Sequence, residues 1–198
     1  MILDKIKEYP IILGSQSPRR CELLKALDID FQVIVKSVDE SIPAAIALDN
    51  AAEYIALKKL DVFNTIEFKN HLVITADTIV LDHTGRVLGK PSNREEARSI
   101  LHDLSGNKHK VFTGVGLLFK GQIYSFTCAT EVMFDVLTAE EINYYIDNYK
   151  PFDKAGSYGI QEWIGRIGIL CINGSYENVM GLPTNRLYKV LKEIEKGL

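Results

Sequence analysis

The segment from residue 11 to residue 27 constrains the fold of this chain more than any other. The apolar run Ile11-Ile12-Leu13 ends in Gly14, a pattern that suits a buried strand. Ser17 can cap a helix, and Pro18 suits the first helical position. The apolar residues that follow recur at helical spacing: Cys21, Leu23, Leu24 and Leu27. A strand that leads through a tight loop into a helix predicts an α/β fold.

The rest of the chain alternates between strand and helix patterns. We predict further strands at residues 31–35, 72–76, 78–81, 86–88, 111–119, 122–134 and 167–172. We predict helices at residues 50–63, 92–104, 138–149 and 183–196, and capping boxes at Ser92-Asn93-Arg94-Glu95 and Thr138-Ala139-Glu140-Glu141. The long hairpin around Lys120-Gly121 would add antiparallel strands to the first strand–helix unit. We therefore expect a mixed sheet with helices packed on it.

Length and composition limit the organisation and the function. The 198 residues contain no repeat or long linker, so we expect a single domain over residues 1–198. The net charge of -3 argues against general binding to nucleic acid. No apolar run approaches the ~20 residues of a membrane span, and the charged residues 1–10 do not form a secretory signal. Three dispersed cysteines are typical of reduced thiols in a cytoplasmic protein.

The loop at residues 15–20 is the first candidate site. Free backbone N–H groups and the helix dipole at the predicted helix start would favour an anion. Ser15 and Ser17 add hydroxyl donors, while Arg19 and Arg20 add guanidinium groups that match phosphate oxygens. From these residues alone, an anion site and a capped helix with two solvated arginines are equally open. The chain has neither a Walker A loop nor a dinucleotide-binding glycine motif.

Asp77 is the second candidate, because it ends the apolar run at residues 72–76. A carboxylate at a strand end can hold Mg²⁺ or orient a water. Aspartate is also common in helix caps and turns. The strand-like residues 78–81 argue against a simple cap and favour the functional interpretation.

Three charged residues and one loop complete the candidates. Glu40, Lys59 and Lys90 are solvated surface charges unless the fold brings them together. In the loop at residues 153–161, Gln161 carries a donor and an acceptor and could read a base edge. The residues alone favour a plain loop that enters a strand. The four histidines show no metal-ligand spacing.

Taken together, these segments resemble the Maf family of nucleoside-triphosphate pyrophosphatases. The matching pieces occur in order across nearly the whole chain: Ser15-Gln16-Ser17-Pro18-Arg19-Arg20, Asp39-Glu40, Ala56-Leu57-Lys58-Lys59, Ala76-Asp77-Thr78-Ile79-Val80, Gly89-Lys90-Pro91, Leu104-Ser105-Gly106, His109-Lys110-Val111-Phe112-Thr113, residues 153–161 and residues 174–183. One such piece would be weak evidence for the family, but this many pieces in the same order are specific to it.

The resemblance implies a Maf-like, inosine-triphosphatase-like fold: an elongated mixed β-sheet with flanking helices and a deep cleft between two lobes. It implies hydrolysis between the α and β phosphates, with a divalent metal cation, Mg²⁺ or Mn²⁺, as cofactor. The loop at residues 153–161 is similar to that of the dTTP/UTP branch, with CTP or modified pyrimidine nucleotides as further candidates. The resemblance also implies a homodimer.

The family pattern assigns roles to individual residues. Asp77 matches the proposed general base, and Glu40 and Asp77 would hold the metal. The expected substrate-binding residues are Ser15, Ser17, Arg19, Arg20, Lys59, Thr78, Lys90 and Gln161. One departure is visible, because the family usually has glycine after the glutamine where this chain has Glu162-Trp163.

Two alternatives stay open at this stage. The first is a pyrophosphatase for another nucleotide, such as 7-methyl-GTP or inosine or xanthosine triphosphate. The second is a non-enzymatic regulator of septum formation. The cations and carboxylates among the matching pieces favour catalysis.

Overall fold

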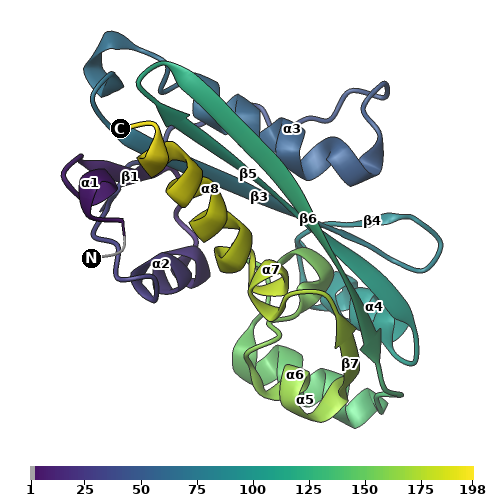
Figure 1. Cartoon of the computed structure of the whole chain (residues 1–198). Helices are drawn as coiled ribbons and strands as arrows, with labels where there is room; N and C mark the ends of the chain where they lie inside the picture. The colour runs from purple at the N-terminus through teal and green to yellow at the C-terminus, as the bar shows by residue number, and fades with distance from the viewer. Residues whose placement is uncertain (1–2) are drawn as a thin grey trace. The chain divides into compact units, whose positions relative to one another are not determined.

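A mixed seven-stranded sheet organises the chain in the computed structural model, which describes residues 3–198 (Figure 1). The strands are β1 (Ile11–Leu13), β2 (Gln32–Val33), β3 (Leu72–Leu81), β4 (Val87–Leu88), β5 (Lys108–Phe119), β6 (Gln122–Phe134) and β7 (Ile169–Asn173). Their order is β2-β1-β3-β5-β6-β7, and β4 pairs with β3. β1 is parallel to β2 and β3, whereas the β3–β4 and β6–β7 pairs are antiparallel. The mixed α/β fold predicted from the sequence is confirmed.

Helices alternate with these strands along the chain. They are α1 (Asp4–Lys7), α2 (Pro18–Lys25), α3 (Leu48–Asp61), α4 (Arg94–Leu104), α5 (Ala139–Tyr149), α6 (Trp163–Gly168), α7 (Tyr176–Met180) and α8 (Thr184–Lys196), with short 3₁₀ turns η1 (Ile66–Phe68) and η2 (Ala155–Ser157). Between residues 3 and 198, no helix has both the length and the apolar character needed to cross a bilayer. Of the N-terminal segment discussed above, Met1 and Ile2 lie outside the described residues.

The chain separates into two compact units. The first contains residues up to 77 together with 113–128 and 181–198, and the second contains residues 78–112 and 129–180. The strands β3, β5 and β6 each contribute residues to both units.

In the first unit, α3 packs against the sheet at close range (Figure 1). A Cβ at Gly114 would lie only 2.1 Å from the backbone nitrogen of Glu53, so only glycine allows α3 to approach β5 this closely. Thr75 donates a hydrogen bond to the Ala56 carbonyl at 2.8 Å, which ties β3 to the same helix. The same unit contains an apolar core: Ile12, Leu60, Phe63, Phe68, Val73 and Leu118. The helix that carries Lys59 is therefore held rigidly on the sheet.

In the second unit, α4 and α5 lie side by side and are joined by an ion pair between Arg94 and Asp147 at 2.8 Å. Thr138 begins α5 with the predicted capping box, which is confirmed. The box predicted at Ser92 is displaced by one residue. Asn93 is the N-cap and accepts from the backbone of Glu96, while the Glu96 carboxylate binds Ser92, because the amide oxygen of Asn93 competes well for the cap.

Three other local predictions need correction. The strand predicted at 31–35 is only the two residues of β2, and residues 167–168 belong to α6 rather than to a strand. Asp77 does not end a strand, because β3 runs without interruption from residue 72 to residue 81. The predicted hairpin turn at Lys120-Gly121, in contrast, is confirmed. Both residues have positive φ, 50° and 77°, as a two-residue type I′ turn requires.

Candidate active site

The loop between β1 and α2 is built around Ser15 and Arg20. The Ser15 hydroxyl oxygen accepts from the Ser17 backbone N–H at 3.3 Å and from Arg20 Nη1 at 3.1 Å. Arg20 Nε donates to the carbonyl of Gly181 at 2.8 Å, and both Ser15 and Arg20 are buried. Ser17 is the N-cap residue of α2, but its side chain makes no capping hydrogen bond. The loop is therefore fixed by buried polar contacts at the start of a helix.

Burial is the main influence on the pKa of Arg20. Desolvation lowers the pKa of its guanidinium, whereas the Asp77 carboxylate raises it, and the neighbouring Arg19 lowers it further. A guanidinium stays protonated in proteins. The cation is thus retained in a partly desolvated place, where its attraction for an anion is stronger than in water.

Lys59, Glu40 and Asp77 form the charged centre of the first unit. Lys59 Nζ lies 2.7 Å from Asp77 Oδ1 and 2.8 Å from Glu40 Oε1. The side chains of Lys59 and Asp77 are only 16% and 14% exposed, whereas that of Glu40 is 53% exposed. The Arg20 guanidinium interacts electrostatically with both carboxylates. The fold thus brings together charges from α2, α3, β3 and the segment after β2.

The carboxylates of Glu40 and Asp77 are suited to a metal that is shared with a substrate. In the part of the chain that the structure describes, there is no group of three or more acidic, histidine or cysteine side chains that could enclose a metal. Mg²⁺ is commonly held by one or two carboxylates together with substrate phosphates and water. Two carboxylates that already share one cation, the Lys59 ammonium, fit that kind of site.

The other predicted site residues belong to the second unit. Thr78 follows Asp77 in β3 and is half-buried, and Lys90 is exposed just after β4. Gln161 is half-buried, and its Oε1 is a buried acceptor with no hydrogen-bond partner among residues 3–198. A buried acceptor of this kind is costly unless a ligand satisfies it.

The loop at residues 153–161 is held by a buried aromatic cluster. The Tyr158 hydroxyl forms a 2.7 Å hydrogen bond with His109 Nε2, and both rings pack against Phe134. Burial lowers the pKa of His109 to about 4, so this histidine is neutral at physiological pH. Gly156 donates its backbone N–H to the Gly89 carbonyl at 3.2 Å. This segment is an ordered loop rather than a plain turn into a strand.

Sequence reasoning missed three residues of this region: His109 as a loop anchor, and Tyr145 and Glu162 as partners. The Tyr145 hydroxyl donates to the Glu162 carboxylate, and Lys154 Nζ lies 3.2 Å from the same carboxylate. The glutamate at the family's glycine position was visible in the sequence. Its partners were not, because Tyr145 lies on helix α5, 17 residues away in the sequence.

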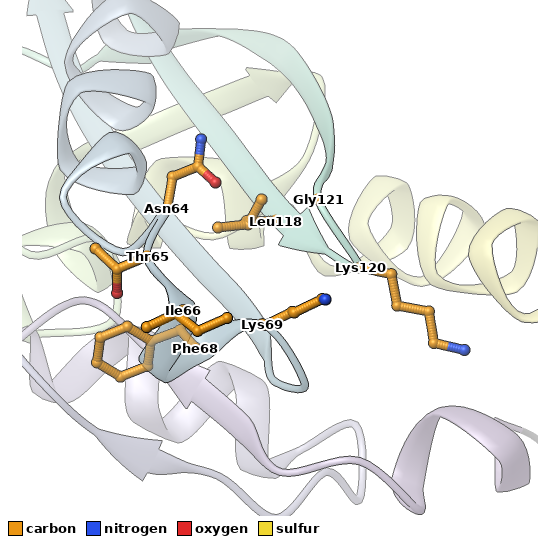
Figure 2. Close-up of a pocket in the computed structure, with 8 residues that line it drawn as sticks. All are labelled: Asn64, Thr65, Ile66, Phe68, Lys69, Leu118, Lys120 and Gly121. Carbon is orange, nitrogen blue, oxygen red and sulfur yellow. The ribbon is translucent and has the colours of Figure 1, made fainter.

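A separate hollow of about 280 Å³ lies elsewhere in the first unit. Its walls come from the segment around η1 and from the turn between β5 and β6 (Figure 2). The lining residues are Asn64, Thr65, Ile66, Phe68, Lys69, Leu118, Lys120 and Gly121. None of them is a carboxylate or a histidine, and the ionisable side chains of the lining are those of Lys69 and Lys120.

The chain is similar to known proteins over nearly its whole length. The chain is 50% identical over 192 residues to a dTTP/UTP pyrophosphatase of Parabacteroides distasonis, which covers 96% of this chain and 99% of the relative. It is 51% identical over 195 residues to a dTTP/UTP pyrophosphatase of Bacteroides thetaiotaomicron, with 98% and 100% covered. Among solved structures, the Staphylococcus aureus Ham1 protein matches with a TM-score of 0.54 at 15% identity, over 93% of this chain and 99% of that one. This last similarity concerns the fold alone.

The family model described as "Maf-like protein" matches residues 10–194, which include every candidate residue named above. That span and the near-full-length identities to curated relatives are decisive. The chain belongs to the Maf-like protein family.

Proposed function

We propose that this protein is a nucleoside-triphosphate pyrophosphatase that hydrolyses dTTP and UTP to the monophosphate and pyrophosphate. The observation that carries the proposal is the Lys59 ammonium placed between the carboxylates of Glu40 and Asp77, in the same unit as the buried loop around Arg20. The dTTP/UTP pyrophosphatases that are about half identical over nearly the whole chain support the substrate class.

The triphosphate binds at the β1–α2 loop. Phosphate oxygens accept from backbone N–H groups at the start of α2, where the helix dipole also favours negative charge. Arg19, which is half-buried, and the Ser17 hydroxyl provide further donors. Arg20 and Ser15 are already bonded to each other, so their contribution is to shape the loop and to supply a desolvated positive charge.

Asp77 acts as the general base toward the attacking water. Its partial burial and its contact with Lys59 hold the carboxylate in one place within β3. Glu40 and Asp77 would hold a divalent cation, Mg²⁺ or Mn²⁺. When bound, this metal would supply positive charge that offsets the phosphates and would make water easier to deprotonate. Lys59 and Lys90 offset the remaining charge of the triphosphate.

Gln161 selects the base. Its buried Oε1, which has no hydrogen-bond partner among residues 3–198, accepts from N3–H of thymine or uracil, and its amide N–H donates to O4. Thr78 contributes a hydroxyl to substrate choice. A site built from such groups rejects bases with the wrong donor pattern. CTP and modified pyrimidine nucleotides are therefore secondary candidates.

Two further properties complete the proposal. The cysteines at 21, 128 and 171 are free thiols, which suits the cytoplasm. The homodimer is proposed from the family resemblance, and sedimentation at several protein concentrations would test it.

A turnover screen tests the function. Purified protein is offered each common ribo- and deoxyribonucleoside triphosphate, 7-methyl-GTP, and inosine and xanthosine triphosphates, with Mg²⁺ or Mn²⁺. Pyrophosphate release is the readout. We expect the highest kcat/KM for dTTP and UTP. A clear preference for a purine triphosphate would contradict the assigned substrate, and no release from any of them would favour the non-enzymatic regulator.

A further inference from the structure

Glu162 is the centre of a closed polar network in the second unit. Its carboxylate accepts from the Tyr145 hydroxyl of α5 and pairs with Lys154 Nζ at 3.2 Å. Lys154 also contacts the Asp153 carboxylate at 2.8 Å. Lys154 is buried, with only 7% of the residue exposed, whereas the Asp153 side chain is 58% exposed. Glu162, whose side chain is 20% exposed, is therefore the better shielded counter-charge of this buried ammonium.

The backbone of the loop folds around the same side chain. The Gly159 N–H donates to the Tyr145 hydroxyl at 3.0 Å, and the Glu162 N–H donates to the Gly159 carbonyl at 3.0 Å. A Cβ at Gly159 would lie 2.7 Å from Cδ of Glu162, so the glutamate occupies the space that a larger residue would need. Tyr145, Gly159 and Glu162 thus lock one another in position.

The network keeps its protons in a defined arrangement. Burial, and then the Glu162 carboxylate, raise the pKa of Tyr145 well above its ordinary value. Tyr145 therefore stays a phenol that donates to Glu162 and accepts from Gly159 across the whole physiological pH range.

The loop also contains a strained backbone conformation and buried polar groups without hydrogen bonds to other described residues, both of which cost free energy. Ser157 has a left-handed backbone with φ of 59°, and it is completely buried. Its hydroxyl has no hydrogen-bond partner in the region from residue 3 to residue 198, and neither has Gln161 Oε1. Strained and unsatisfied groups persist only where surrounding contacts determine them, and such places are commonly ligand sites.

Gln161 immediately precedes Glu162 in the sequence. The network therefore fixes the backbone that carries the side-chain amide of Gln161. The orientation of that amide matters chemically. Uracil and thymine present a donor at N3 and an acceptor at O4, whereas cytosine presents the reverse pattern. A glutamine amide that rotates by half a turn would serve cytosine equally well.

We propose that Glu162, through Tyr145 and Lys154, is a positioning residue that holds Gln161 for selection of uracil and thymine over cytosine. The inference rests on the proposed function, because it assigns a base-reading role to Gln161. The glutamate at the family's usual glycine position therefore sharpens base choice in this chain and takes no part in bond cleavage.

The test compares three variants with the wild type. Glu162→Gln keeps the size but removes the charge that holds Lys154, and Tyr145→Phe removes only the hydroxyl. Asp147→Asn is the matched control, since it breaks an exposed ion pair on the same helix α5. For each protein, kcat and KM are measured separately for dTTP and dCTP.

We expect Glu162→Gln and Tyr145→Phe to lower the ratio of kcat/KM for dTTP to that for dCTP by roughly tenfold, through KM for dTTP. Asp147→Asn should leave the ratio unchanged. Hydrogen exchange of the Gly159 amide should accelerate in Tyr145→Phe, and this measurement stands even where Glu162→Gln folds poorly. The inference is overturned if Tyr145→Phe is folded, its Gly159 amide exchanges faster, and its ratio of kcat/KM for dTTP to that for dCTP is unchanged. In that case, turnover of dTTP by the wild type still supports the proposed function. A wild type without turnover overturns both.

Discussion

The ammonium nitrogen of Lys59 lies 2.7 Å from Oδ1 of Asp77, and this ion pair joins helix α3 to strand β3. The same nitrogen lies 2.8 Å from Glu40 Oε1, so one lysine neutralises one of two carboxylates. The pair is shielded from solvent by the protein, which strengthens it relative to a surface ion pair. The remaining negative charge of Glu40 and Asp77 would attract a metal ion, and the Lys59 ammonium would attract a phosphate.

Asp77→Asn should abolish most turnover without changing the fold. The amide keeps the size of the carboxylate but cannot take a proton, so kcat for dTTP should fall by about 10²-fold or more. The measurement is steady-state pyrophosphate release together with circular dichroism of the variant. Asp39→Asn is the matched control, because Asp39 is an exposed carboxylate that pairs with Lys58. Equal kcat in Asp77→Asn and wild type would remove Asp77 from the chemistry.

Lys59→Met should tighten the binding of Mn²⁺ to the nucleotide-free protein. Without the ammonium, Glu40 and Asp77 repel each other and attract a divalent cation more strongly. Calorimetric titration with Mn²⁺ alone should show a Kd lower by roughly tenfold. Lys58→Met, in which a neighbouring lysine is lost from an exposed pair, should bind Mn²⁺ as the wild type does. Weaker binding in Lys59→Met would mean that these carboxylates are not the metal ligands.

Arg19→Ala and Arg20→Ala should fail in different ways. Arg19 is half-buried and should matter for substrate, so its loss should raise KM for dTTP with little change in stability. Arg20 holds Ser15 and the Gly181 carbonyl in the interior, so its loss should lower the free energy of unfolding by about 2 kcal/mol. Urea denaturation and steady-state kinetics on both variants check this. Equal stability of the two variants would contradict the structural role of Arg20.

The protein should lose stability between pH 6.5 and pH 4 because of His109. Burial lowers the pKa of this histidine to about 4, whereas in the unfolded chain it titrates near its ordinary value of 6.5. In this window only the unfolded chain takes up the proton, so acidification favours unfolding by up to about 3 kcal/mol, and the loss saturates below pH 4.

Urea denaturation as a function of pH measures the effect. His109→Gln should flatten the curve between pH 4 and pH 6.5, at the expense of lower stability at pH 7. His83→Gln, at an exposed turn, should leave the slope as it is in the wild type. A slope in His109→Gln as steep as the wild-type slope would assign the acid sensitivity to other groups.

The strand–loop–helix start and the long hairpin were predictable because their signals are local. Gly14 marks the end of β1, and Pro18 marks the start of α2. Lys120-Gly121 marks the hairpin turn. The short helix α7 was missed, because five residues are too few for a periodic apolar pattern to show.

The chemistry of the site was predictable by residue type but not by contact. Lys59 and Asp77 are 18 residues apart, and Arg20 and Gly181 are 161 residues apart. Such pairs form only when the sheet brings its strands together, and no spacing rule encodes them. Glu162 was visible as a departure from the family pattern, but its role depends on Tyr145, which reaches it from α5.

The most direct test of the central claim is the identity of the products formed from dTTP. Wild-type protein and dTTP are incubated with Mg²⁺ in the absence of any other phosphatase, and the products are separated by ion exchange. We predict dTMP and pyrophosphate in equal amounts, at a rate that Asp77→Asn loses. Release of orthophosphate with dTDP, or no reaction at all, would contradict the assignment of this protein as a dTTP/UTP pyrophosphatase.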